Sequence, residues 1–253
     1  NTFLYGVQTW FIFSFPYYIF ALAYAFWIAP RIRKSRSISI PDNFRDVYGE
    51  RAGILSALIL SFLASPAPYL LGMGFVIQFM FGLELGMALI ISTIFSAIYV
   101  WNGGFGAVVR TDLIQFILMF AGFFILLGYL WHNVQSPILL IKDLPDSYLD
   151  PLGGNTLQYI LAWFFLAAWT FIDPGFFQRC AAAKTPEMAQ RGILISILFW
   201  AIFDCLTITC ALYAVGKIQP GQAALTFPLL ASAVLPVGVF DLLMTGITAP
   251  LIY

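Results

Sequence analysis

The amino-acid sequence predicts an all-α protein, a polytopic bundle of helices that cross a membrane. Only 9% of the 253 residues are charged, whereas 61% are hydrophobic, and the mean hydropathy is +0.90. A soluble domain carries roughly 25% charged residues. Runs without any charged residue cover 1–30, 52–83, 85–109, 113–141 and 151–172. A helix needs about 20 apolar residues to cross a bilayer, and each run meets or exceeds that length.

This pattern contains about seven apolar segments, at residues 4–29, 52–81, 84–101, 110–132, 155–178, 192–215 and 227–253. We expect each to be a helix, because an open chain satisfies its backbone hydrogen bonds in lipid only as a helix. The segments are also too long for the strands of a membrane barrel. Between the fourth and fifth segments, residues 133–154 are rich in turn-forming residues, which predicts an external loop with room for a short helix.

The basic residues predict how the segments are oriented. Ten of the twelve Lys and Arg residues fall in three alternate connections, 30–51, 102–110 and 179–191. The opposite side has only Lys142 and Lys217. An excess of Lys and Arg marks the cytoplasmic side, so we expect these three connections to be cytoplasmic and the N-terminus to lie outside. The expected location is a cell membrane, either the plasma membrane or a bacterial inner membrane.

Several classes of function have no support in the sequence. The only histidine is His132, so triads and metal sites built on histidine are absent, and we expect no enzyme. The three cysteines follow no metal-binding or disulfide spacing: Cys180, Cys205 and Cys210. The formal net charge is zero, which gives no electrostatic reason to expect a nucleic-acid partner.

Carboxylates inside apolar runs are costly in lipid, so each is a candidate for function. Asp112 lies at the start of a segment, where it suits either the first turn of a helix or a cation ligand. Asp204 lies near the middle of the sixth segment, as a protonated or hydrogen-bonded packing acid or as part of a site. Asp173 precedes Pro174, and we expect this pair to break the helix or to form a turn at the membrane edge. For Asp241 we expect an interfacial position.

Three stretches resemble the motifs of the sodium:solute symporter family. "GGFGAVVRTDLIQFILM" (103–119) is similar to its GG-x-x-AV-x-x-TD-x-x-Q signature, and its Gly pair is expected to form a tight turn. "FFQRCAAAKTPEMAQRG" (176–192) is similar to a cytoplasmic loop of the family. "PRIRKSRSISIPDNFRDVYG" (30–49) resembles its basic loop followed by a helix start. The stretches occur in the order found in the family, each on the side that the charges predict to be cytoplasmic.

The resemblance implies a LeuT-type fold, in which two five-helix inverted repeats surround a site in the middle of the membrane. The seven segments would then be core helices 2 to 8 of ten. Residues 1–253 would form a single transmembrane transporter domain that is incomplete at both ends. In the family, core helix 1 and hydroxyls late in core helix 8 build the sodium site. On this interpretation the chain alone is not expected to bind sodium.

The resemblance also implies roles for particular residues. On the path of the sodium ion it places Thr111 and Asp112. Around the substrate cavity and its gate it places Ser14, Tyr17, Trp169 and Thr170. Asp204 matches neither general motif of the family, and we expect it to be specific to a subgroup, either lining this cavity or serving as a buried acid. At a helix break we expect Asp173 and Pro174. A sugar carrier of the family has an acid in place of Ser14 and a lysine in place of Trp200, and these two departures weigh against a sugar substrate.

The function that the resemblance implies is sodium-coupled symport of a small polar solute by alternating access. Sodium would be the co-transported ion, no other metal is expected, and a monomer in the lipid bilayer would suffice. A solute sensor built on the same membrane domain is the alternative. A seven-helix receptor fits the number of segments, but it gives no reason for the three motifs.

Overall fold

A computed structural model describes residues 2–35 and 37–248, without the side chains of 99, 100, 102–108 and 220. Within this part of the chain every regular element is a helix, which confirms the all-α prediction. Five helical stretches are long and apolar enough to cross a membrane: Trp10–Lys34, Glu50–Phe81, Val109–Asn133, Leu157–Ala182 and Pro186–Leu212. Shorter apolar helices cover Leu85–Ile98, Gly221–Val234 and Val237–Thr248.

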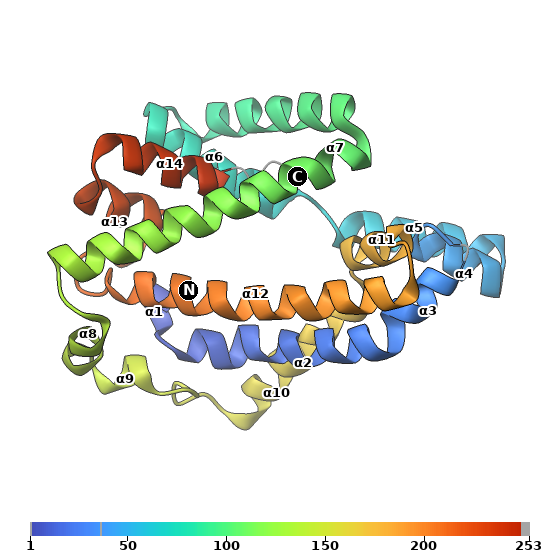
Figure 1. Cartoon of the computed structure of the whole chain (residues 1–253), viewed down its shortest axis with the longest axis horizontal. Coiled ribbons are helices and arrows are strands. Elements are labelled where there is room, and N and C mark those ends of the chain that lie inside the picture. Colours follow the sequence, from blue (N-terminus) through green and yellow to red (C-terminus); the bar gives the residue numbers. More distant parts are fainter. Residues whose placement is uncertain (1, 36, 249–253) are drawn as a thin grey trace. The chain divides into compact units, whose positions relative to one another are not determined.

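The helices, shown in Figure 1, group into two compact units, which are described separately. Unit 1 consists of Asn1–Gly6, Pro66–Leu149 and Cys205–Tyr253, and unit 2 consists of Val7–Ser65 and Asp150–Asp204. The sequence-based assignment of one transporter domain stays a prediction.

Two prolines shape the first membrane span, which belongs to unit 2. The span changes from a π-helix to an α-helix twice, through η1 (Trp10–Ser14), α2 (Phe15–Ala23), η2 (Tyr24–Ile28) and α3 (Ala29–Lys34). Pro16 follows the first π-turn and Pro30 follows the second. Proline has no N–H to donate, and its ring clashes with the carbonyl four residues earlier. A wider π-turn relieves this clash without ending the helix.

The core of unit 2 forms where small residues let three spans approach closely. Ala21, Ala25 and Ala29 repeat at intervals of four along the first span and are fully buried. Phe177 and Cys180 of α11 (Pro174–Ala182) and two residues of α12 (Pro186–Leu212), Ala189 and Ile193, join them in one apolar cluster. Unit 2 also contains α10 (Leu157–Leu166) and the 3-10 helix η3 (Ala167–Ile172), which packs against α2.

The connection predicted as a basic loop followed by a helix start contains α4 (Ile40–Tyr48), which forms a hairpin with α5 (Glu50–Leu63). Ser39 is the N-cap of α4, and its hydroxyl accepts a hydrogen bond from the Asp42 backbone N–H, 3.3 Å away. The Asp42 carboxylate in turn accepts from the Ser39 N–H at 3.1 Å, which completes a capping box. Gly49 turns the chain between the two helices at φ 91°, a conformation that favours glycine.

The predicted segment 52–81 is not one helix. α5 ends at Leu63, and α6 (Ala67–Phe81) begins after Pro66. Pro66 and Pro68 remove two backbone donors in succession, which explains why the helix stops here. The two halves belong to different units.

Unit 1 is built around α7 (Leu85–Asn133), with α14 (Val237–Thr248) packed against it. The segments 84–101 and 110–132 were predicted to be separate helices, but the helical assignment runs through both of them and through the Gly pair at 103–104. The prediction of a non-helical turn there is wrong. Figure 1 shows that α7 instead bends sharply between two straight arms. Glycine costs a helix about 1 kcal/mol without ending it, which is consistent with a bend rather than a break.

The predicted segment 227–253 also divides, into α13 (Thr226–Val234) and α14. Leu235 lies between them in an extended conformation, at φ −92° and ψ 143°. The cause is Pro236, because the residue before a proline is disfavoured in the helical region. The end of this segment, residues 249–253, lies outside the described part of the chain.

Short helices complete unit 1: α1 (Thr2–Tyr5), α8 (Pro137–Asp143), α9 (Asp146–Leu149) and the 3-10 helix η4 (Pro220–Leu225). Two of them, α8 and α9, lie in the connection for which the sequence predicted a loop with a short helix. After α9 the chain enters unit 2, where Asp150 accepts hydrogen bonds from the N–H groups of Leu152 at 2.9 Å and Gly154 at 3.0 Å.

The capping box of α4 is expected to govern how often this helix opens. Ser39→Ala removes the hydroxyl acceptor, and loss of such a cap costs about 1 kcal/mol. Hydrogen exchange of the α4 amides should become about five-fold faster. Ser56→Ala in α5 is the matched control, because the Ser56 hydroxyl donates only to the Gly53 carbonyl of its own helix, at 2.9 Å. Equal exchange rates in both variants would contradict the role of the cap.

The same capping box predicts a pH dependence. The hydrogen bond from the Ser39 hydroxyl is the main cause that holds the pKa of the Asp42 carboxyl below its usual value. A carboxyl whose pKa is lowered by folding contributes stability above its unfolded pKa of about 3.9 and loses it as the pH falls through the folded pKa. Opening of α4 should therefore be independent of pH between neutral pH and about pH 5, and increase below about pH 4. The measurement is pulse-labelling hydrogen exchange, corrected for the intrinsic exchange rate.

The packing of α14 on α7 gives a second pair of variants. A Cβ on Gly122 would approach the Leu243 side chain within 2.9 Å and its Cα within 3.1 Å, whereas a Cβ on Gly128 would meet nothing within 4 Å. Overpacking costs about 1–3 kcal/mol. Gly122→Leu should lower the thermal unfolding temperature of the intact protein in detergent, while Gly128→Leu in the same helix should not. The idea fails if both variants unfold at the same temperature.

Candidate functional site

Unit 2 contains a cavity of about 390 Å³ between the first span and α12. Its lining is formed by Phe13, Ser14, Tyr17, Tyr18, Trp200, Phe203 and Asp204. The structure thus brings together three residues that the sequence assigned to the substrate cavity: Ser14, Tyr17 and Asp204. The first span and α12 are far apart in the sequence, so only tertiary packing joins these residues.

Local helix geometry explains why each side chain reaches the cavity. Ser14 is the last residue of the π-turn, and Tyr17 and Tyr18 follow in the first turn of α2. On α12, Trp200, Phe203 and Asp204 are spaced at i, i+3 and i+4, which places them on one face of the helix. The cavity is therefore formed by a distorted stretch of one span and a regular face of another.

Asp204 is the charged group of this lining. It lies eight residues before the end of α12 at Leu212, about 12 Å along the helix at 1.5 Å per residue. Its carboxylate accepts a hydrogen bond from the Tyr18 hydroxyl. Tyr18 is buried, and its hydroxyl oxygen accepts from the Trp10 indole N–H at 3.3 Å. A chain of two hydrogen bonds thus fixes the carboxylate at membrane depth, where an acid is costly without partners.

The aromatic part of the lining depends on the helix break at Asp173 and Pro174. Asp173 is the N-cap of α11, and its carboxylate accepts from the Phe176 N–H at 2.8 Å. The Phe176 ring stacks on Trp200, with ring centroids 5.5 Å apart and planes inclined by 16°. The break therefore positions the ring that supports Trp200, although neither Asp173 nor Pro174 lines the cavity.

Two other predicted residues of the substrate site lie elsewhere in unit 2. Trp169 and Thr170 belong to the 3-10 helix η3, and neither lines the cavity. Thr170 is buried, and its hydroxyl donates to the Ala167 carbonyl of the same turn at 2.9 Å. This hydroxyl stabilises a helix turn here.

Thr111 and Asp112 lie in unit 1, half-buried on α7. Asp112 does not occupy the first turn of a helix, because α7 begins 27 residues earlier at Leu85. The sequence-based alternative that the helix dipole accounts for this acid is therefore wrong. Among the described residues no group of three or more His, Cys, Asp and Glu side chains is placed to hold a metal ion.

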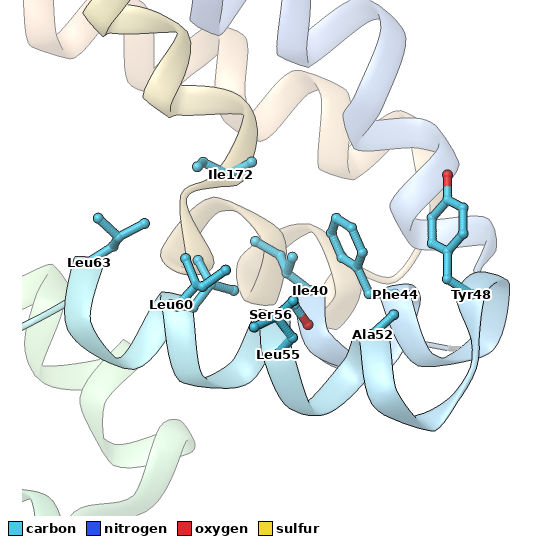
Figure 2. A pocket seen from close by; sticks show the side chains of 10 residues that line it. Ile40, Phe44, Tyr48, Ala52, Leu55, Ser56, Leu60, Leu63 and Ile172 are labelled. Atoms are coloured by element: carbon cyan, nitrogen blue, oxygen red, sulfur yellow. The ribbon is translucent and has the colours of Figure 1, made fainter.

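A larger groove of about 520 Å³ lies between the α4–α5 hairpin and Ile172. Figure 2 shows that its walls are mostly aliphatic and aromatic, with Leu55, Leu60 and Leu63 along α5. Its hydroxyl at Ser56 already donates to a carbonyl of its own helix. The Tyr48 hydroxyl is the other polar side-chain group of this lining, which contains no charged residue, whereas the smaller cavity contains a carboxylate. The smaller cavity is therefore the better candidate for a site that orients a small polar molecule.

Reasoning from the sequence missed Tyr18, the partner of Asp204, and it did not assign Phe13 or Phe203 to the cavity. Tyr18 lies one helical turn after Ser14, and Phe203 is adjacent to Asp204, so helical spacing was a signal that could have found them. The hydrogen bond between Tyr18 and Asp204 joins residues 186 positions apart, and no local pattern reveals it.

Comparison with known proteins gives an independent result. The model of the sodium:solute symporter family matches residues 1–252. The sodium/pantothenate symporter of Haemophilus influenzae is 28% identical over 180 residues, which cover 67% of this chain and 37% of the relative. The sodium/glucose cotransporter 1 of Mus musculus is 31% identical over 89% of this chain and 42% of its own length. The high affinity choline transporter 1 of Homo sapiens is 22% identical over 76% of this chain and 33% of its own length.

The chain therefore spans less than half the length of these relatives. The family model, however, covers nearly all of the chain, including the three stretches whose motifs suggested the family. Its members are membrane transporters rather than enzymes. We conclude that this chain belongs to the sodium:solute symporter family.

Proposed function

We propose that the protein to which this chain belongs imports a small polar solute together with sodium ions. The observation that carries this proposal is the cavity that holds Ser14, Tyr17 and Asp204 between two membrane spans. A concave site with a few polar groups on a mostly apolar wall is typical of small-molecule binding. The relatives named above are a pantothenate symporter, a glucose cotransporter and a choline transporter, which supports sodium-coupled transport without selecting one solute.

The driving force for such transport is sufficient. One elementary charge that crosses a membrane potential of 100 mV releases about 2.3 kcal/mol, before any concentration gradient is added. In the proposed cycle sodium binds first and favours the outward-open state, and the solute then enters the cavity. The two repeats rock, sodium leaves to the cytoplasm, and the solute follows. One copy of the protein contains all the parts that this cycle needs.

We assign to Asp112 a role in the release of sodium, with Thr111 beside it. Asp112 lies three residues after the start of the candidate span Val109–Asn133 and two residues after Arg110, on the side that the basic residues predict to be cytoplasmic. It is half-buried, so it is accessible from water and yet close to the apolar interior. Carboxylate oxygens are suitable ligands for a hard cation, and a position near the cytoplasm suits the last step before the ion departs.

Asp112→Asn in the intact protein tests this function. Without the charge, sodium should bind more weakly along its path, and the sodium concentration for half-maximal solute uptake should rise about ten-fold, equivalent to about 1.4 kcal/mol. The measurement is solute uptake into proteoliposomes over a range of sodium gradients. Asp241→Asn is the matched control, because Asp241 is an exposed acid of unit 1 and is the fifth residue of α14. Uptake that does not depend on sodium would refute the function, and unchanged sodium dependence in Asp112→Asn would refute the role of this residue.

A further inference from the structure

We propose that the solute is a small organic cation that carries an alkylated ammonium group. The inference rests on the proposed function, because it names the class of solute that the cavity of unit 2 would accept. Three properties of the cavity lead to it: the charge of its lining, the aromatic content of its walls and its volume.

The charge of the lining favours a cation. The seven lining side chains include one acid, Asp204, and no lysine, arginine or histidine. The Tyr18 hydroxyl is a neutral donor, so its hydrogen bond to the carboxylate brings no positive charge into the lining. A cation that enters the cavity gains Coulomb attraction, which is stronger at membrane depth than in water. An anion meets repulsion, and a neutral solute gains nothing from the charge.

The walls favour a particular kind of cation. Five of the seven lining residues are aromatic: Phe13, Tyr17, Tyr18, Trp200 and Phe203. The face of an aromatic ring attracts a cation within about 6 Å of its centre, and tryptophan does so best. A primary ammonium brings three N–H donors that need acceptors. The lining has oxygens at Ser14, Tyr17, Tyr18 and Asp204, whereas the rings of Phe13, Phe203 and Trp200 offer none. An ammonium whose donors are replaced by methyl groups suits the contacts with these rings.

Further contacts hold the Asp204 carboxylate and the Trp200 indole in place. The Trp10 indole N–H and the Tyr18 hydroxyl orient the carboxylate. The Phe176 ring stacks on Trp200, one turn before Asp204 on α12, and fixes the plane of the indole. Groups held in advance lose less entropy when the solute binds. The volume of about 390 Å³ lies within the range of small-molecule sites, about 300–1,000 Å³.

Pairs of molecules that differ in charge but hardly in shape test the proposal. Choline is paired with 3,3-dimethylbutan-1-ol, and tetramethylammonium with tert-butanol. Binding to the intact protein in detergent, with sodium present, is followed by quenching of tryptophan fluorescence. We expect each cation to bind at least ten-fold more tightly than its neutral partner, as one favourable cation–π or charge contact requires.

Two variants test the residues. Asp204→Asn should weaken binding of both cations by about ten-fold and leave the neutral partners unchanged, which a general loss of structure would not do. Trp200→Phe keeps a ring and should retain the preference for cations, whereas Trp200→Leu should lose part of it. Asp241→Asn, an acid that does not line the cavity, should behave as the unchanged protein, and thermal unfolding of each variant verifies that it is folded.

The outcomes separate this proposal from the function on which it rests. Equal affinities within both pairs, tighter binding of the neutral partner, or no binding of either cation would overturn the assignment of a cationic solute. Unchanged binding of the cations to Asp204→Asn would overturn the assignment of this site. Sodium-driven uptake of a neutral or anionic solute alone retains the symport function and rejects the cation. Binding of cations without sodium-driven uptake supports the cation and rejects symport.

Discussion

The architecture depends on one constraint, which is that a chain in hydrocarbon must satisfy its backbone hydrogen bonds internally. Each proline inside an apolar run removes one donor and has to be accommodated. Two solutions occur in this protein. Pro16 and Pro30 each follow a π-turn and leave the helix continuous, whereas Pro66 and Pro236 coincide with breaks between helices. The positions of these prolines therefore decide which apolar segments form one continuous helix and which are divided into two helices.

The same constraint shapes the cavity. The wide turn that precedes Pro16 ends at Ser14, so the residues that accommodate the proline also line the cavity. Pro174 ends the helical region at Asp173, and the carboxylate of Asp173 caps the helix that follows. That helix carries Phe176, which supports Trp200. Departures from a regular helix thus position lining residues on both spans, Ser14 on the first span and Trp200 on α12. This agrees with the common occurrence of π-turns and broken membrane helices at functional positions.

Much of the fold was predictable because hydrophobicity and charge are local properties. The helical class, the membrane spans and the start of α4 at Ser39 all follow from short stretches of sequence. The division at Leu235 follows from the single residue Pro236. The helical backbone through the Gly pair at 103–104 was not predicted, because glycine permits both a turn and a bend and its neighbours decide between them. In the cavity, the family resemblance indicated Ser14 and Tyr17, and the position of an acid in the middle of an apolar segment indicated Asp204. The contact between Asp204 and Tyr18, however, depends on how two distant spans pack.

The hydrogen bonds that hold Asp204 also bear on what the cavity recognises. A basic partner in the lining would stabilise the carboxylate, but it would cancel the field that a solute experiences. The Tyr18 hydroxyl and the Trp10 indole stabilise it through hydrogen bonds and add no positive charge to the lining. The aromatic side chains around it add the negative faces of their rings. The carboxylate and the ring faces attract positive charge in the same sense, so the proposed selectivity for a cation would follow from the way in which the acid is held.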